Sequence, residues 1–423
     1  MNDRDPSSRF WRISAGGIFF QGGAAAVDSS TIIAALVHGL TGSSFAVGAA
    51  AAILRYGWLF PQLFVAYFAQ RRRRRMPFYM VGAFGRATCL IGIAALLAFA
   101  GSLPGAFVVA MFFALWTLYA FVSGIVAVPY NDIVARSVPS ARRSRLLALR
   151  FFGGGLLALG VAAAAHRLLG ALPFPAGTAA IVLIGAVLLY ASSLSFVSAG
   201  EPDAPPPVET GRFGQFLRQG LDVFRSDRRF RIFVYAQWLG GAVTMSLPFY
   251  ILQVMAVRGP PSNAASDIAF LLGAQTVGAL ASNALWGWWG DRHGKRSLLE
   301  GVALLRSVPP LLTIAWGLAV AAGPLPAFAG FAVVFFLLGA LSNGITIAML
   351  GYLMEISPDD RRPAYSGYFN ALVAPAALLP LAGAAIVEVV SLTAVFAVSF
   401  LAALLQFLAV RRLRALSDGA VGG

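Results

Sequence analysis

The chain has 423 residues, of which 59% are hydrophobic and 12% are charged. So apolar a composition excludes an ordinary water-soluble globular protein and indicates a chain that is solvated by lipid. The net charge of +15 does not indicate a nucleic-acid-binding protein, because the basic residues lie in short interruptions between apolar segments and not on one face.

Twelve predominantly apolar segments follow one another along the chain. Each has about 20 residues, which is the length that a helix needs to cross the hydrocarbon core. Their approximate centres are Ala25, Tyr56, Cys89, Trp116, Leu159, Leu188, Thr244, Val277, Ile314, Leu338, Ala376 and Leu401. The sequence therefore predicts an all-α membrane protein with twelve transmembrane helices. Cys89 is the only cysteine, so neither an internal disulfide nor a cysteine metal site is expected.

The first two segments contain charged residues at matching depths. Asp28 and Arg55 both lie about 20 to 25 Å from the cytoplasmic ends of their helices, at a rise of ~1.5 Å per residue. We therefore predict an ion pair between them. The pair has two interpretations. Either Asp28 takes up and releases a proton during transport, while Arg55 tunes its proton affinity or holds an anionic substrate, or a permanent pair fixes the two helices together.

Basic residues gather at one end of the segments. Clusters such as Arg71 to Arg75 follow the even-numbered segments, whereas the opposite loops have almost none. By the positive-inside rule, both termini are predicted to be cytoplasmic. Arg86 in the third segment and Arg306 in the ninth lie nearer the cytoplasmic third, where side chains that snorkel to the interface are expected. Asp132 and Arg150, at the ends of the fourth and fifth segments, are assigned to a cytoplasmic gate.

A polar break at residues 201–230 divides the chain. It opens with Glu201-Pro202-Asp203-Ala204-Pro205-Pro206-Pro207, which is stiff linker chemistry. Phe213, Phe216, Leu217, Leu221 and Phe224 then recur at helical spacing, which indicates either a short amphipathic helix on the cytoplasmic leaflet or a solvated linker. We expect one six-helix bundle at residues 1–200 and a second at residues 231–423.

Two short motifs occur once in each half. Residues 139–143 and 358–362 both read P-x-x-R-R between apolar segments. The run Gly287-Trp288-Trp289-Gly290-Asp291-Arg292-His293-Gly294-Lys295-Arg296 has a degraded copy at Ala66 to Arg75, in which Gln70 stands in place of Asp291. Self-similarity at so long a period indicates two structural halves.

The G-x-x-x-D-R-x-G-K-R pattern of residues 287–296 resembles the cytoplasmic loop signature of the major facilitator superfamily, a large family of membrane carriers. The resemblance implies two pseudo-symmetric six-helix bundles, with this loop joining the second and third helix of each. It also implies that Asp291 faces the start of the fifth helix, and the first copy the start of the eleventh. Contacts there would close the cytoplasmic side.

Charges at these helix starts favour the same gate. Arg142 and Arg143 at the start of the fifth helix are unfavourable beside a helix N-terminus unless an anion such as Asp291 compensates them. The tract at Arg71 to Arg75 would pair in the closed state with Asp359, Asp360 or Glu355. Alternatively, these charges only follow the positive-inside rule and are solvated. Besides Asp132 and Asp291, the predicted gate comprises Gln70, Arg71, Arg142, Arg143, Gly287, Arg292, Gly294, Arg296, Glu355, Asp359 and Arg362.

Uncharged polar and aromatic side chains lie in the middle of other segments. An isolated amide there can line a substrate path, although an interhelical hydrogen bond is its commoner role. Trp58, Trp116 and Trp238 indicate either an aromatic-walled cavity or ordinary core packing. With Asp28 and Arg55, the predicted pathway residues are Gln21, Trp116, Gln237, Gln275, Asn343 and Asn370.

The resemblance implies a secondary carrier that moves a small molecule by alternating access. No catalytic constellation and no phosphate-binding loop is recognised, so neither an enzyme nor a cofactor is expected. Asp28 favours protons as the coupling ion. The alternative is a non-transporting receptor or membrane assembly factor of the same fold, which the degraded first motif keeps open.

The expected partners are a small-molecule substrate, protons and the lipid bilayer, with no nucleic acid, and the protein is expected to be a monomer. A single lysine among 32 basic residues, with abundant alanine and glycine, indicates a GC-rich bacterial gene. We therefore expect a multi-pass protein of the bacterial inner membrane.

Overall fold

The computed structural model describes residues 6–69, 72–202, 213–258, 264–322, 327–357 and 362–418. Within these ranges the chain is helical and contains no strand. Among the described residues, 10 helical stretches are long and apolar enough to cross a membrane. The all-helical membrane class is confirmed, whereas the number of twelve crossings stays a prediction.

The 10 stretches are Met76–Ala98, Gly105–Ser137, Leu149–Ala171, Ala176–Ala199, Arg228–Val257, Asp267–Arg292, Gly294–Val320, Phe328–Leu353, Tyr368–Val389 and Leu392–Leu413. Large apolar side chains remain exposed on them, for example Val81, Leu194 and Leu318. An exposed apolar surface of this kind suits contact with acyl chains, because lipid does not penalise it as water does.

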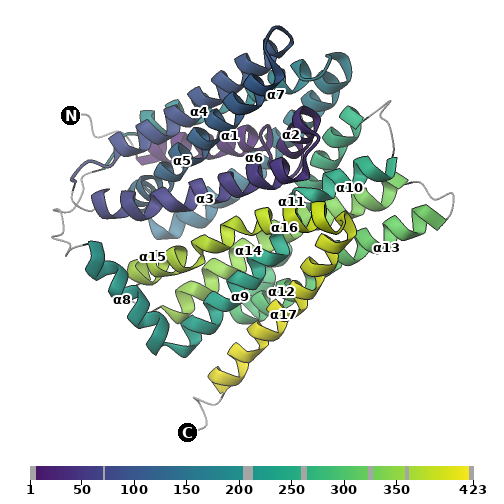
Figure 1. Ribbon diagram of the computed structural model, residues 1–423. Coiled ribbons are helices and arrows are strands. Elements are labelled where there is room, and N and C mark those ends of the chain that lie inside the picture. The colour runs from purple at the N-terminus through teal and green to yellow at the C-terminus, as the bar shows by residue number, and fades with distance from the viewer. Residues whose placement is uncertain are drawn as a thin grey trace. The chain divides into compact units, whose positions relative to one another are not determined.

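The chain forms two compact units. Unit 1 comprises Met1–Gly42, Ile53–Thr210 and Ser262–Gly273. Its helices are α1 (Pro6–Ala25), α2 (Ile32–Thr41), most of α3 (Ser44–Ala69), α4 (Met76–Ala98), η1 (Ala100–Ser102), α5 (Gly105–Ser137), α6 (Ser140–Ala171) and α7 (Ala176–Ala199). Helix α1 packs against α6 and α7, and α4 packs against α5 and α7 (Figure 1).

The first apolar segment is not one continuous helix. Helix α1 ends at Ala25, α2 begins at Ile32, and a turn lies between them. In that turn the Asp28 Oδ1 atom accepts hydrogen bonds from the backbone N–H of Ser30 at 3.0 Å and its hydroxyl at 2.6 Å, and from the Thr31 hydroxyl at 2.8 Å. Such local side-chain bonds compete with the helical ladder, and they give a physical reason for the break.

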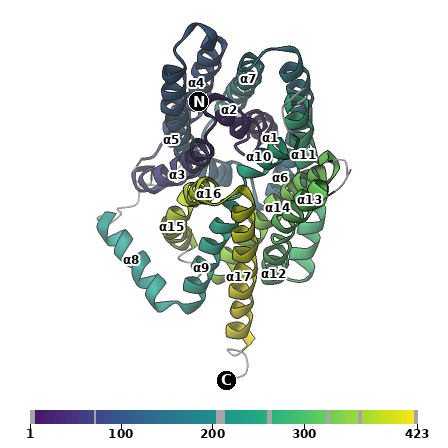
Figure 2. The same cartoon turned by 45° about the vertical axis from the view of Figure 1, so that its right-hand side comes forward.

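Unit 2 comprises Ser43–Ala52, Gly211–Pro261 and Ala274–Gly423. Its elements are α8 (Phe213–Ser226), α9 (Arg228–Thr244), α10 (Phe249–Arg258), most of α11 (Ala264–Arg292), α12 (Lys295–Leu305), α13 (Val308–Ala322), α14 (Ala327–Ile356), α15 (Arg362–Val373), η2 (Ala374–Leu378), α16 (Leu379–Val389) and α17 (Leu392–Asp418). Helix α9 runs beside α17 (Figure 2), and α12 packs against α14 and α17.

A helix is present in the predicted linker. Helix α8 is followed by Asp227, whose carboxylate accepts a hydrogen bond from the Phe230 N–H at 3.0 Å and so caps the start of α9. The Tyr365 hydroxyl donates to the same carboxylate at 3.3 Å. This polar corner fixes the beginning of α9 within unit 2. The predicted boundaries at residues 200 and 230 stay predictions.

Candidate functional site

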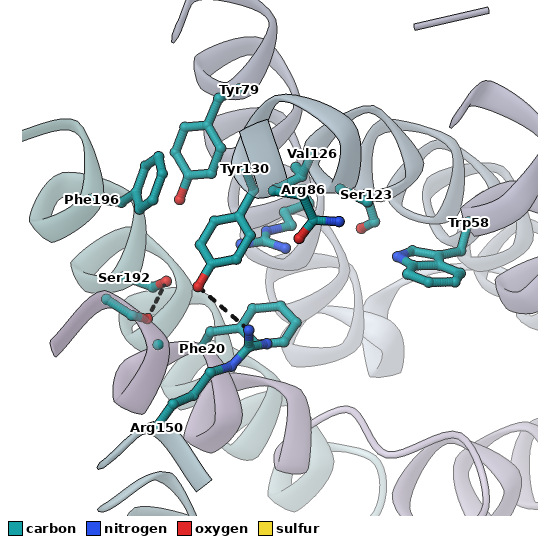
Figure 3. Close-up of a pocket in the computed structure, with 14 residues that line it drawn as sticks. Phe20, Trp58, Tyr79, Arg86, Ser123, Val126, Tyr130, Arg150, Ser192 and Phe196 are labelled. Atoms are coloured by element: carbon teal, nitrogen blue, oxygen red, sulfur yellow. Dashed lines mark hydrogen bonds between the residues drawn. The ribbon is translucent and has the colours of Figure 1, made fainter. Parts of the chain in front are cut away.

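Unit 1 contains a cavity of about 270 Å³. Its polar lining comprises Asn131 and, as labelled in Figure 3, Tyr79, Arg86, Ser123, Tyr130, Arg150 and Ser192. Its apolar lining includes Phe20, Trp58, Val126 and Phe196. Ligand pockets have volumes of about 300–1,000 Å³, so a cavity of this size suits a small solute.

Glycines of α1 let neighbouring helices reach the cavity. A Cβ atom on Gly17 would lie 2.9 Å from Cγ of Arg150, so a larger residue would displace that side chain. At Gly16 the backbone carbonyl accepts a hydrogen bond of 2.7 Å from the Ser192 hydroxyl of α7. The small residues of α1 therefore permit the close approach of α6 and α7 on which the cavity wall depends.

Two arginines of the cavity approach one aromatic ring. The guanidinium carbon of Arg86 lies 4.8 Å from the centroid of Phe20, and that of Arg150 lies 5.2 Å from it. Both distances are within the range of cation–π attraction. Arg150 also donates a long hydrogen bond of 3.4 Å to the Tyr130 hydroxyl (Figure 3). Phe20 thus helps to orient both cations toward the same space.

Arg86 has no polar partner in the described part of the chain. The residue is 5% exposed, and neither a hydrogen bond nor an ion pair joins its guanidinium to a described residue. The Nε atom of Arg150 is likewise buried without a hydrogen bond. None of the described residues that line the cavity is acidic. The described lining therefore has two cationic groups and no counter-charge.

The prediction that Arg86 and Arg306 snorkel to the membrane interface is wrong. Arg306 is 7% exposed, and it donates hydrogen bonds to Gln406 Oε1 at 2.8 Å and to the Gly240 carbonyl at 3.0 Å. Arg86 lies on the buried face of α4, with Gly82 and Ala83 one turn before it. Both side chains are therefore buried within their own units, and Gly240 leaves room for Arg306, since a Cβ atom there would lie 3.1 Å from its Nη1 atom.

The predicted pair of Asp28 and Arg55 is not brought together. The three hydrogen-bond donors to the Asp28 carboxylate are the backbone N–H and the hydroxyl of Ser30 and the hydroxyl of Thr31, and Arg55 is not among them. Neither residue is among the described residues that line the unit 1 cavity. Gln21 is also outside that lining; its Cβ and Cγ atoms face Gly154 of α6.

The other predicted pathway residues are dispersed. Trp116 is fully buried and stacks between Phe112 and Tyr119 in unit 1, as core packing would place it. Asn343 of α14 donates to Asn283 Oδ1 of α11 at 3.0 Å, which is the interhelical role expected of an amide.

Three amides remain. Gln237 is buried, and its amide nitrogen has no hydrogen bond in the described structure. Gln275 lies on α11, and Asn370 is half-buried on α15. All three amides stay predictions as pathway residues.

Asp132 belongs to an ionic cluster inside unit 1. Its carboxylate pairs with Arg75 and, at 2.5 Å, with Arg136. Arg136 also pairs with Glu201 at 2.9 Å. The Glu201 carboxylate in turn accepts hydrogen bonds from the backbone N–H of Arg75 and of Met76, both at 2.9 Å, where α4 begins. The cluster therefore ties the ends of α4, α5 and α7 together.

The second loop signature forms a local turn. Asp291 pairs with Lys295 at 2.8 Å, and its side chain is 81% exposed. Gly294 has a φ of 83°, a left-handed conformation that favours glycine, and it directly precedes α12, which begins at Lys295. Arg292 lies over the Trp288 ring at 5.8 Å from its centroid.

The remaining gate residues stay predictions. Arg142 and Glu355 are exposed, and a Cβ atom on Gly287 would meet open space. Arg296 is half-buried at the start of α12. Residues 70, 71 and 359, which are Gln70, Arg71 and Asp359, lie outside the described residues. The side chains of Arg143 and Arg362 lie outside the described part as well.

Of the residues that line the cavity, sequence reasoning named only Trp58 as a possible cavity wall. Arg150 was assigned to the gate, and Tyr79, Ser123, Tyr130 and Asn131 were not recognised. A usable signal was present in α4, where Tyr79, Gly82, Ala83 and Arg86 recur at helical spacing on one buried face. An arginine on such a face points into the bundle and not to lipid.

A family model described as the Major Facilitator Superfamily matches residues 261–420. Curated relatives include the uncharacterized protein Rv2209 of Mycobacterium tuberculosis and the uncharacterized protein Mb2232 of Mycobacterium bovis. Each is 26% identical over 221 residues, which is 49% of this chain and 40% of the relative. The match thus spans less than half of the length of these relatives.

Solved structures of transporters share the fold across nearly the whole chain. A mutant form of the nucleoside transporter NupG is 13% identical and superimposes with a TM-score of 0.69, covering 96% of this chain and 99% of that one. A POT family transporter in complex with 5-aminolevulinic acid is 11% identical, with a TM-score of 0.70 and coverage of 98% and 96%. A bacterial homologue of the iron transporter ferroportin is 16% identical, with a TM-score of 0.65 and coverage of 96% and 99%.

Proposed function

We propose that the chain is a secondary transporter of a small polar solute in a bacterial inner membrane, because a family model of the Major Facilitator Superfamily matches residues 261–420 and solved transporters share its fold. The observation that supports this most directly is the polar cavity of unit 1, which lies within a fold shared with transporters of nucleosides, peptides and iron. Those solutes differ too much in chemistry to indicate the substrate of this chain.

The proposal includes twelve crossings in two six-helix bundles, at residues 1–200 and 231–423, that alternate in exposing the site to either side of the membrane. The 10 apolar stretches and the two compact units support this arrangement. The predicted gate of Asp291, Arg142 and Arg143, and that of Arg71 with Asp359, belong to the same proposal. Both termini would be cytoplasmic, and the protein would work as a monomer.

Alternation can be measured with pairs of spin labels. After Cys89→Ser, one pair would be placed at Arg73 and His293, near the two loop signatures, and another at Ser102 and Val390, at the opposite helix ends. We expect each pair to show two distance populations, and conditions that shorten one distance should lengthen the other. A single unchanging population for both pairs would exclude a carrier, and a receptor or assembly factor would then be the better function.

Proton coupling would use Asp28. The Asp28→Asn variant removes the charge but keeps an Oδ1 atom that can accept the hydrogen bonds from Ser30 and Thr31. We therefore expect correctly folded protein whose uptake into proteoliposomes no longer responds to a pH gradient. Thr31→Val, which removes one of these hydrogen bonds and leaves the carboxylate, should retain the response. If Asp28→Asn remains fully pH-dependent, Asp28 has only a structural role in the turn.

A further inference from the structure

We infer that the solute of the unit 1 cavity is a small oxyanion, bound between the guanidinium groups of Arg86 and Arg150. The inference rests on the proposed function for its claim that the anion is transported, but binding itself does not depend on that function. It starts from a deficit of negative charge. Two cations line the cavity, and its described lining contains no carboxylate.

Two buried arginines without an anion lower the free energy of unfolding unless a ligand supplies the missing negative charge. A charge taken out of water must be balanced by an opposite charge or by hydrogen bonds, or its burial opposes folding. The Phe20 ring and the 3.4 Å contact with the Tyr130 hydroxyl compensate only part of the cost. The two guanidinium groups beside one ring also repel each other. An anion bound between them would balance the buried positive charge and would also offset this repulsion.

Two other arginines, the buried Arg306 and the half-buried Arg136, have polar partners from the chain. Arg306, at the corresponding place in the second half, donates to Gln406 and to the Gly240 carbonyl. Arg136 pairs with Asp132 and Glu201. The fold therefore supplies acceptors where an arginine is structural. At Arg86 the described chain supplies none, which points to an acceptor that arrives from solution.

The chemistry of the lining defines the class of anion. A guanidinium group presents paired N–H donors whose spacing matches the two oxygens of a carboxylate or phosphate. Tyr130 and Asn131 add neutral polar groups, and Phe20 and Trp58 offer apolar surface to a short carbon chain. The volume of about 270 Å³ admits only a small molecule. A short dicarboxylate or inorganic phosphate fits this description.

Binding can be tested by thermal unfolding of the purified protein in uncharged detergent, with chloride to keep the ionic strength constant. Succinate and inorganic phosphate are the anionic probes, and glucose and choline are the neutral and cationic ones. We expect succinate, phosphate or both to raise the melting temperature in a saturable manner, and glucose and choline to leave it unchanged. If neither anion raises it, the inference is wrong.

Three variants separate binding from folding. Arg86→Gln should weaken the bound anion roughly 10- to 100-fold, because a charge-assisted interaction is lost. In buffer without the probes it should melt at or above the temperature of the wild type, since it loses an unpaired buried charge. Arg150→Lys keeps the charge but not the paired donors and should weaken binding less. Arg306→Gln, the matched control, should melt lower and keep the full anion response. An anion response that is retained in both cavity variants would contradict the assignment.

Flux measurements distinguish this inference from the proposed function. Uptake of labelled succinate or phosphate into proteoliposomes, abolished by Arg86→Gln, supports both. Binding without uptake and without alternation would leave the anion site standing and overturn the transport function. Alternation and uptake of glucose, with no response to either anion, would support transport and overturn the anion site.

Discussion

Replacing Gly278 by alanine should lower the melting temperature of the protein, even though alanine favours helix formation. Gly278 of α11 lies directly against the backbone of Phe336 in α14, and a Cβ atom there would collide with the Phe336 carbonyl oxygen. One turn away, a Cβ atom on Gly339 would collide with the Gln275 carbonyl oxygen. Because both obstacles are backbone atoms, no rotamer change relieves them, and the helices must separate.

The cost of that separation exceeds the gain in helix propensity. Overpacking costs about 1–3 kcal/mol and occasionally more, whereas exchanging a helical glycine for alanine gains at most ~1 kcal/mol. Separation would also strain the hydrogen bonds that join the two helices, among them those from Trp286 Nε1 and the Ser282 hydroxyl to the Ala340 carbonyl. Melting curves and the monodisperse yield in detergent would report the loss.

Gly273→Ala is the matched control on the same helix. There the nearest atom to a new Cβ is the Cβ of Ala162 at 3.9 Å, which is an ordinary contact. This variant should melt at or slightly above the temperature of the wild type. If Gly278→Ala behaves like Gly273→Ala, the close crossing of α11 and α14 is not present in the folded protein.

The transmembrane stretches were predictable because spanning a membrane is a property of each segment by itself. Cys89, Trp116 and Leu188, chosen as centres from hydropathy, lie in Met76–Ala98, Gly105–Ser137 and Ala176–Ala199. In hydrocarbon every backbone polar group must be satisfied within the segment, so about 20 apolar residues form a helix whatever surrounds them.

The break after α1 was harder to predict because it depends on a few local hydrogen bonds. The run Asp28-Ser29-Ser30-Thr31 contains four residues that readily bond their own backbone or one another. An average over about 20 residues conceals such a run among its apolar neighbours. The same turn supplies three hydrogen-bond donors to one oxygen of Asp28. The sequence had predicted Arg55 as the partner of this carboxylate.

The cavity was not predictable because it depends on the rotation of each helix and on which helices are neighbours. Arg86 and Arg150 are 64 positions apart in the sequence, and only the packing of α1, α4 and α6 brings both to Phe20. The depth of a residue along a helix can be read from a sequence. For Arg86, depth alone led to the wrong prediction that its side chain snorkels to the membrane interface. Direction around the helix decides whether an arginine at that depth reaches the interface or the interior.

Replacing Glu201 by alanine should destabilise unit 1 more than the loss of any exposed ion pair. The Glu201 side chain is 10% exposed, and it binds Arg136 together with the first N–H groups of α4. Burial, followed by the charge of Arg136, lowers the pKa of the Arg75 side chain, whereas the Glu201 carboxylate raises it. Among the described residues, removing this carboxylate therefore leaves Asp132 as the only anion that pairs with the two neighbouring arginines, and it leaves a helix N-terminus without its anion.

Breaking a buried pair by removing one partner costs about 3–5 kcal/mol, because the other charge is left uncompensated. We expect Glu201→Ala to approach the lower end of that range and to lower the melting temperature clearly. Asp291→Ala is the matched control, since it also removes the carboxylate of an ion pair, here with Lys295, but the Asp291 side chain is 81% exposed. An exposed pair contributes about 1 kcal/mol or less. If the two variants melt at the same temperature, removing the Glu201 carboxylate costs no more than removing a solvated one. The carboxylate then does not hold the start of α4 to the ends of α5 and α7.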